Sequence, residues 1–266
     1  MNNLRLSLVQ GDTRWHDPAA NRDYYGDLIA PLHGTTDLVL LPETFTSGFS
    51  NEALASAETM AGPTVAWMAQ QARTLGAAVT GSVQIRDGDG VFNRLLWADA
   101  DGNAHRYDKR HLFRMAGEHE RYAAGRDRMS VDLHGWRVCP LVCYDLRFPV
   151  FSRNRFDVEA EGRFDYDLLL YVANWPAARR HAWRSLLPAR AIENLAYVAA
   201  VNRVGTDGNG HDYAGDSVVH DFLGQPLVEC GAQPQVVTAT LSAAALAKHR
   251  ERFPAQLDAD RFELRD

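Results

Sequence analysis

Residues 138–149, Val-Cys-Pro-Leu-Val-Cys-Tyr-Asp-Leu-Arg-Phe-Pro, carry the strongest structural signal in the chain. The first five form a short apolar run, which is typical of a fully buried strand. The run ends at Cys143, and a polar and aromatic turn follows. A thiol at such a strand end has a fixed backbone, while its side chain faces a cleft. The stretch therefore predicts a buried sheet with a reactive residue at one of its strand ends.

Short apolar runs alternate with helical patterns along the rest of the chain. Strands are predicted over residues 4–10, 38–41, 77–85, 91–98, 104–107, 130–133, 136–142, 168–172, 197–202, 217–221, 227–229 and 236–241. Helices are predicted over residues 18–32, 64–75, 148–154, 178–194 and 242–252, with Asp17 capping the first, and loops over 110–129 and 205–212. Because strands and helices are interleaved throughout, the sequence favours one α/β domain over residues 1–266.

The composition is that of an ordinary globular protein, with 46% hydrophobic and 23% charged residues among 266. A net charge of -6 argues against a nucleic-acid binder. No apolar stretch approaches the roughly 20 residues of a membrane span, and the N-terminus lacks the pattern of a signal peptide. Three cysteines without metal-type spacing favour free thiols in a reducing compartment. We therefore expect a cytoplasmic protein with no metal, nucleic-acid or membrane partner.

Two further strand ends carry groups that a thiol enzyme would use. Glu43 follows the apolar run 38–41 and a proline, where partial burial makes a carboxylate a better base. Lys109 follows the strand at 104–107, where it would set a cation against negative charge developing on a substrate oxygen. Each residue also has an ordinary interpretation, as a surface glutamate and as part of a solvated basic run. Their shared position at strand ends is what favours catalysis.

The thiol of Cys143 has an ordinary interpretation too, because cysteine is often a small buried hydrophobe. That interpretation is assigned to Cys139 and Cys230, which have no attending pattern. A helix beginning near Phe148 would favour a thiolate at Cys143 through its N-terminal amides. Activation by histidine is the alternative, but no histidine of the 110–129 loop has a partnering pattern. A cysteine protease is therefore disfavoured.

Taken together, three motifs resemble those of the nitrilase superfamily of carbon–nitrogen hydrolases. They are Leu-Leu-Pro-Glu43, Tyr-Asp-Lys109-Arg-His-Leu-Phe and Val-Cys143-Tyr-Asp-Leu-Arg-Phe-Pro, in the family's order and with similar spacing. Supporting matches are Phe92-Asn93, Ala173-Asn174-Trp175-Pro176 and Arg190-Ala191-Ile192-Glu193-Asn194. The resemblance extends from the first strand to about residue 241. It implies an α/β fold of the nitrilase type, a four-layer αββα sandwich, and a homodimer.

The resemblance also implies roles for the site residues. Glu43 would be the base, Cys143 the nucleophile that forms a thioester, and Lys109 the cation that meets the oxyanion, together with the backbone amide of Tyr144. No cofactor is implied.

The family has a second glutamate in the loop after the lysine, a few residues before a glycine. Glu118 and Glu120 both fall in that loop. Glu118, seven residues before Gly125, matches the family's spacing better and is the predicted residue.

The motif at Glu43 and the sequence Asn174-Trp175-Pro176 look most like the ω-amidase branch. Members of that branch hydrolyse the terminal amide of short dicarboxylic or keto-acid monoamides. Nitrile hydrolysis, decarbamoylation and acyl transfer to an amine remain alternatives at the same three residues. An inactive binding module is an alternative from another class, which the intact Glu43, Lys109 and Cys143 argue against.

A substrate of this kind carries a distal carboxylate that needs a cation. The arginines near the relevant strand ends are Arg147, Arg153, Arg179, Arg180 and Arg184, and the sequence does not choose among them. Predicted pocket walls are Tyr144, Trp175 and Phe113, for which burial in the core is an equal alternative.

Overall fold

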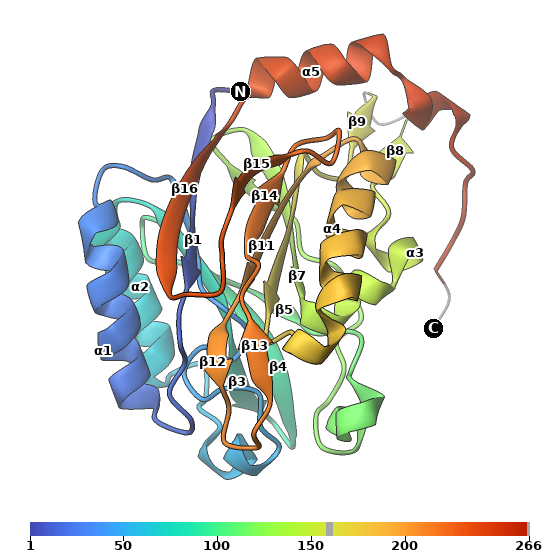
Figure 1. The fold of residues 1–266 in the computed structure, drawn as a ribbon. Helices are drawn as coiled ribbons and strands as arrows, with labels where there is room; N and C mark the ends of the chain where they lie inside the picture. Colours follow the sequence, from blue (N-terminus) through green and yellow to red (C-terminus); the bar gives the residue numbers. More distant parts are fainter. Residues whose placement is uncertain (158–161, 265–266) are drawn as a thin grey trace.

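Two six-stranded mixed sheets face one another in the structure, a computed structural model that describes residues 1–157 and 162–264 (Figure 1). Sheet A contains, in spatial order, β16 (Gln235–Leu241), β1 (Leu4–Gln10), β2 (Leu38–Leu40), β3 (Ala78–Asp87), β4 (Gly90–Ala98) and β5 (Ala104–Asp108). Sheet B contains β15 (Pro226–Glu229), β14 (Val218–His220), β11 (Tyr197–Asn202), β10 (Leu168–Ala173), β7 (Trp136–Val142) and β6 (Val131–Leu133).

Helices cover the outer face of each sheet. α1 (Pro18–Ile29) and α2 (Pro63–Leu75) pack on sheet A, whereas α4 (Arg180–Asn194) packs on β11 and β14 of sheet B. Figure 1 shows the four layers in succession, from α1 and α2 through the two sheets to α4. The predicted αββα sandwich is confirmed.

The remaining elements are short or peripheral. They are α3 (Pro149–Ser152), α5 (Ala243–Arg252), the strand pairs β8 (Phe156–Asp157) with β9 (Arg163–Phe164) and β12 (Val204–Thr206) with β13 (Asp212–Ala214), and the 3-10 turns η1 (Ala30–Leu32), η2 (Glu52–Ser56), η3 (Arg114–Ala116), η4 (Glu118–Glu120), η5 (Cys143–Arg147), η6 (Ala177–Arg179) and η7 (Ala255–Asp258). None of the helices in the described part of the chain has the length and apolar character that crossing a membrane requires.

The strand β2 of sheet A is apolar on both faces because each face has a partner layer. Leu38 and Leu40 belong to the core between the two sheets, whereas Val39 belongs to the core between sheet A and its helices. Successive side chains of a strand point to opposite faces, so the continuous run at 38–41 fills both cores at once. This explains why the sequence of β2 shows no polar alternation.

Most predicted elements lie where the sequence put them, and Asp17 caps α1 by accepting a hydrogen bond from the backbone N–H of Ala20 at 3.0 Å. Two predictions need correction. The helix predicted over 148–154 is only the four residues of α3. The stretch predicted as the loop 205–212 is a hairpin, in which β12 and β13 pair antiparallel.

Candidate active site

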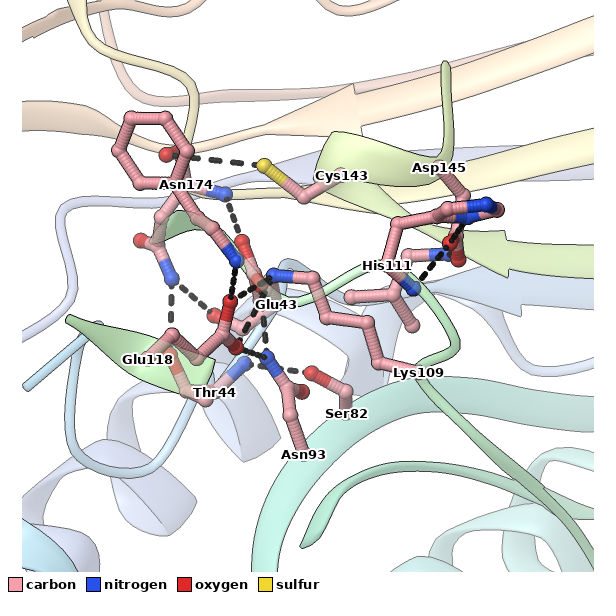
Figure 2. A network of polar contacts seen from close by, with 12 residues as sticks. Glu43, Thr44, Ser82, Asn93, Lys109, His111, Glu118, Cys143, Asp145 and Asn174 are labelled. Carbon is pink, nitrogen blue, oxygen red and sulfur yellow. Dashed lines mark hydrogen bonds and ion pairs between the residues drawn. The ribbon is translucent and has the colours of Figure 1, made fainter. Parts of the chain in front are cut away.

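The three catalytic candidates follow strands that end at one edge of the molecule. In sheet A, Glu43 comes just after β2 and Lys109 just after β5. In sheet B, Cys143 follows β7 and Asn174 follows the parallel strand β10. Ligand sites of α/β proteins form beyond the carboxyl ends of the strands. Here two facing sheets each contribute half of such a site, and Figure 2 shows the resulting cluster.

Two of these strand ends have strained backbones. Cys143 has a φ of 43° and Thr44, next to Glu43, has a φ of 41°. Positive φ is uncommon for residues other than glycine, and most unfavourable for a β-branched residue such as threonine. The sharp turn at Cys143 takes the chain from β7 directly into η5 and turns the thiol out of the strand. Strain of this kind clusters at functional sites, where the surrounding structure maintains it.

A buried ionic cluster lies beside the thiol. The Lys109 ammonium donates to Glu43 Oε1 at 2.9 Å and to both carboxylate oxygens of Glu118, at 3.1 and 3.0 Å. All three side chains are almost completely buried. Glu118 Oε2 also accepts from the backbone N–H of Phe113 at 2.6 Å. Glu120, the other glutamate of this loop, has a side chain that is 68% exposed and lies outside the cluster.

Two asparagines hold Glu43 in place. Asn93 Nδ2 donates to Glu43 Oε1 at 2.7 Å, and the backbone N–H of Asn174 donates to Glu43 Oε2 at 2.8 Å. The Asn174 side chain donates to the backbone oxygen of Glu43 at 2.6 Å. The backbone oxygen of Asn174 lies 3.9 Å from the sulfur of Cys143. Asn174 therefore links the carboxylate of Glu43 to the thiol across the two sheets.

Burial and charge set the protonation states in this cluster. Burial raises the pKa of the Cys143 thiol well above its ordinary value, and the Glu43 carboxylate raises it further. Burial alone would lower the pKa of Lys109, but Glu118 and Glu43 raise it well above the ordinary value. Burial also raises the pKa of Glu118. The resting site therefore holds a protonated thiol beside an ammonium ion, and the expectation that helix amides near Phe148 favour a thiolate is wrong.

A second hydrogen-bond network, centred on Asp145, stabilises the turn that begins at Cys143. Asp145 accepts hydrogen bonds from the Tyr107 hydroxyl at 2.8 Å and from the backbone N–H of Val142 at 3.0 Å. His111 contacts the same carboxylate through its backbone N–H and through Nδ1, at 3.1 and 2.7 Å (Figure 2). Among the described residues, no histidine forms a hydrogen bond with the Cys143 thiol. His111 thus stabilises the turn at Cys143 through Asp145 and does not bind the sulfur.

A cavity of about 380 Å³ opens in front of the cluster, a size suited to a small ligand. Glu43, Lys109 and Cys143 line it. The three predicted wall residues line the same cavity: Phe113, Tyr144 and Trp175. Cys139 and Cys230 are buried elsewhere, and burial raises the pKa of each to about 12.

Sequence reasoning missed several residues of this site. In the sequence, Asn93 and Asn174 stand out only as parts of motifs, whereas the structure buries both of them beside Glu43. The β12–β13 hairpin supplies Asn209, His211 and Tyr213 to the cavity lining. No local signal connected that hairpin to a pocket formed by residues 43–175.

A thiol, a carboxylate and an ammonium at the shared edge of two facing sheets form an arrangement typical of thiol-dependent hydrolases. The chain belongs to the carbon–nitrogen hydrolase family, whose model matches residues 5–251. The omega-amidase YafV of Escherichia coli (strain K12) is 48% identical to it, over 99% of this chain and 100% of that protein.

Two more relatives agree with this assignment. The 2-oxoglutaramate amidase of Bacillus subtilis (strain 168) is 32% identical, over 94% of this chain and 95% of that protein. The solved structure of a CN-hydrolase superfamily protein from Xanthomonas campestris, with an arsenic adduct in its active site, is 69% identical. It superposes with a TM-score of 0.98 over 99% of this chain and 100% of that one. The predicted nitrilase-superfamily enzyme, of the ω-amidase branch, that cleaves an amide C–N bond is confirmed.

Proposed function

We propose that the enzyme is an ω-amidase that releases ammonia from the terminal amide of a short dicarboxylic or 2-oxo-dicarboxylic monoamide. The observation that carries this proposal is the buried group of Glu43, Lys109 and Cys143 at the wall of a cavity sized for a small molecule. The relatives that act as omega-amidase and as 2-oxoglutaramate amidase support the choice of substrate.

The first half of the reaction forms a thioester. Because the thiol of Cys143 is protonated at rest, Glu43 takes its proton as the sulfur attacks the amide carbon. The carbonyl oxygen becomes an oxyanion, which the ammonium of Lys109 and the backbone N–H of Tyr144 stabilise. The C–N bond then breaks, and the proton held by Glu43 passes to the nitrogen, which leaves as ammonia.

The second half hydrolyses the thioester. Glu43, ionised again, takes a proton from a water molecule that attacks the acyl carbon. The C–S bond breaks, the acid leaves, and the proton returns to the sulfur of Cys143. Glu118 holds the ammonium of Lys109 by two hydrogen bonds throughout, which keeps the cation aimed at the oxyanion.

The test is to detect the thioester and to remove its sulfur. Wild-type enzyme mixed with a monoamide and quenched in acid should show an acyl mass increment on the peptide containing Cys143. We expect Cys143→Ala to lose ammonia release by a factor of about 10⁴ or more with its fold intact, because no other group supplies the nucleophile.

Cys230→Ala is the matched control, because Cys230 is a buried thiol that does not line the cavity. It should keep wild-type activity. Ammonia release by Cys143→Ala at the wild-type rate would refute the scheme. A panel with nitriles, N-carbamoyl compounds and amine acceptors, scored for acid, ammonia and transferred product, separates the related reactions.

The assembly and location are further parts of the proposal. We propose a homodimer that forms on the sheet B side, because exposed apolar side chains gather there: Ile192 on α4, Phe253 after α5 and Leu257 on η7 are 53%, 58% and 62% exposed. Light scattering after gel filtration should give twice the chain mass, and Ile192→Glu should reduce it. We also propose one domain over residues 1–266 and a cytoplasmic location, where the three cysteines stay reduced.

A further inference from the structure

The five arginines near the strand ends separate into two groups in the structure. Arg180 forms an ion pair with Asp216, and Arg184 forms one with Glu229. Arg153 donates to the backbone oxygen of Glu193 at 2.8 Å and does not line the active-site cavity. Only Arg147 and Arg179 of the five line the cavity that contains Cys143.

Arg147 is held over an aromatic ring close to the nucleophile. It ends η5, the turn that begins with Cys143, and its guanidinium carbon lies 5.0 Å from the centre of the Trp175 indole. The indole is itself fixed, because its N–H donates to the backbone oxygen of Arg179 at 2.8 Å. The backbone N–H of Trp175 donates to Asn202 Oδ1 at 2.8 Å.

Arg179 has the same arrangement on the neighbouring wall. Its guanidinium carbon lies 5.0 Å from the centre of the Phe113 ring, which packs edge-on against Tyr144 with ring centres 5.0 Å apart. A guanidinium that stacks on a ring by its face keeps its N–H edge available for a carboxylate.

Among the described residues, no ion pair joins either guanidinium to an acid. The acids that line the cavity are Glu43, the exposed Glu52 and Asp207. Glu43 is bound to Lys109. Asp207 accepts from the Tyr213 hydroxyl at 2.9 Å and from two backbone N–H groups of its own hairpin. Two carboxylates already surround the Lys109 ammonium, so the arginines of the cavity are left to meet an anionic substrate. These are Arg121, Arg147 and Arg179, of which Arg147 and Arg179 are stacked on aromatic rings of the wall.

We propose that Arg147 and Arg179 form a clamp for the distal carboxylate of the substrate, and that this clamp gives the enzyme its preference for ω-monoamides over neutral amides. The inference rests on the proposed function and assigns residues to it. Phe113 and Trp175, with the guanidinium groups stacked on them, form the wall against which the short carbon chain lies.

The experiment compares two amides of equal carbon number, succinamate with a distal carboxylate and butyramide without one. Arg147→Gln and Arg179→Gln should each lower kcat/KM for succinamate about 10- to 100-fold, since each removes a charge-assisted hydrogen bond. The ratio of kcat/KM for succinamate to kcat/KM for butyramide should fall about 10-fold or more in both variants, because butyramide has no carboxylate for the clamp to bind. Arg184→Gln, an exposed arginine outside the cavity, is the matched control and should behave as wild type on both amides.

Other outcomes overturn the clamp. An equal loss on both amides would mean that the arginines only support the walls, and no loss on either would mean that they bind nothing. A selective loss in Arg121→Gln alone would move the cation to Arg121, the third arginine of the cavity lining. Arg179→Lys keeps the charge but not the planar fork, and should show an intermediate loss on succinamate only.

If the proposed function is wrong, the result will differ from a failure of the clamp alone. In that case wild-type enzyme would hydrolyse butyramide at least as well as succinamate, whatever the arginine variants do.

Discussion

At the scale of single residues, Cys143 combines a strained backbone with a buried, protonated thiol. Its φ of 43° turns the sulfur out of β7, and burial together with the neighbouring Glu43 raises its pKa. In the proposed mechanism a protonated thiol reacts only after a base has taken its proton, so the activation of Cys143 depends on Glu43.

The protonation of Cys143 gives a spectroscopic prediction. At about pH 9 an ordinary thiol is more than half ionised, but the raised pKa keeps Cys143 protonated there. The ultraviolet thiolate band should therefore be absent from the native wild-type minus Cys143→Ala difference spectrum at about pH 9, and should be present in denaturant at the same pH. A native difference band near neutral pH would contradict the assigned protonation state.

Removal of Lys109 should destabilise the protein. It lies between two buried carboxylates, so Lys109→Met leaves them facing each other without a cation. We expect the free energy of unfolding at about pH 7.5 to fall by roughly 3–5 kcal/mol, as when other buried pairs lose one partner. The measurement is urea unfolding of the variant and of Lys248→Met, which changes the chain's other lysine, an exposed one.

The sign of the pH dependence follows from Glu118. Burial raises the pKa of this carboxyl in the folded state, so its protonated form favours folding, and that contribution is lost as pH rises through the folded pKa. Without the positive charge of Lys109, which lowers the pKa of Glu118, the pKa of Glu118 is raised further. The defect of Lys109→Met should therefore shrink between about pH 7.5 and 5.5. A defect that grows on acidification would refute this account of the cluster.

At the scale of elements, the β12–β13 hairpin completes the cavity. Asp207 organises its tip by accepting from the backbone N–H groups of Asn209 and His211, both at 2.9 Å, while its other oxygen accepts from Tyr213. The hairpin thus carries a self-contained hydrogen-bond network to the cavity lining. Its strands pair with each other and belong to neither large sheet.

Removal of the Asp207 hydrogen bonds should weaken substrate binding more than it slows the chemical step. Asp207→Ala removes three hydrogen bonds, each worth about 1 kcal/mol, and should raise KM about tenfold with a smaller change in kcat. Hydrogen exchange over residues 204–214 should increase in parallel. Asp212→Ala on the same hairpin changes an exposed residue that accepts a hydrogen bond from Thr206, and should leave both constants near wild type.

At the scale of the whole molecule, the packing of the two sheets brings together the proposed reacting groups. Glu43 and Lys109 come from sheet A, and Cys143 and Asn174 come from sheet B. The distance between the Glu43 carboxylate and the Cys143 sulfur therefore depends on how the sheets pack. Tyr107 in β5 reinforces this packing beside the site, because its hydroxyl binds Asp145 in η5.

Adjacent leucines of β4 test this dependence. Leu95 belongs to the core between the sheets and Leu96 to the core under α2, and both are fully buried. Leu95→Ala and Leu96→Ala should each cost about 2–5 kcal/mol of unfolding free energy. Only Leu95→Ala should also lower kcat at a temperature where both variants are folded. Equal kcat values for the two variants would show that the packing between the sheets does not set the catalytic geometry.

The sequence alone determined the class of fold, most element positions and the identities of Glu43, Lys109 and Cys143 as candidates. Local patterns suffice for these, because an apolar run with a polar residue at its end indicates a buried strand and its exposed terminus. The sequence did not predict the hairpin at 204–214, because its two strands are short, polar and joined through glycines. Their pairing depends on a tertiary position against the cavity.

Only the tertiary structure decided which arginines face the cavity, that both oxygens of Glu118 bind Lys109, and that the thiol is protonated. Each of these depends on distances between groups that are far apart along the chain. Glu43 and Asn174, for example, are separated by 131 residues and are joined by a hydrogen bond of 2.8 Å. Spacing along the sequence carries no information about such contacts, because they arise when two sheets, each with its own local pattern, are packed face to face.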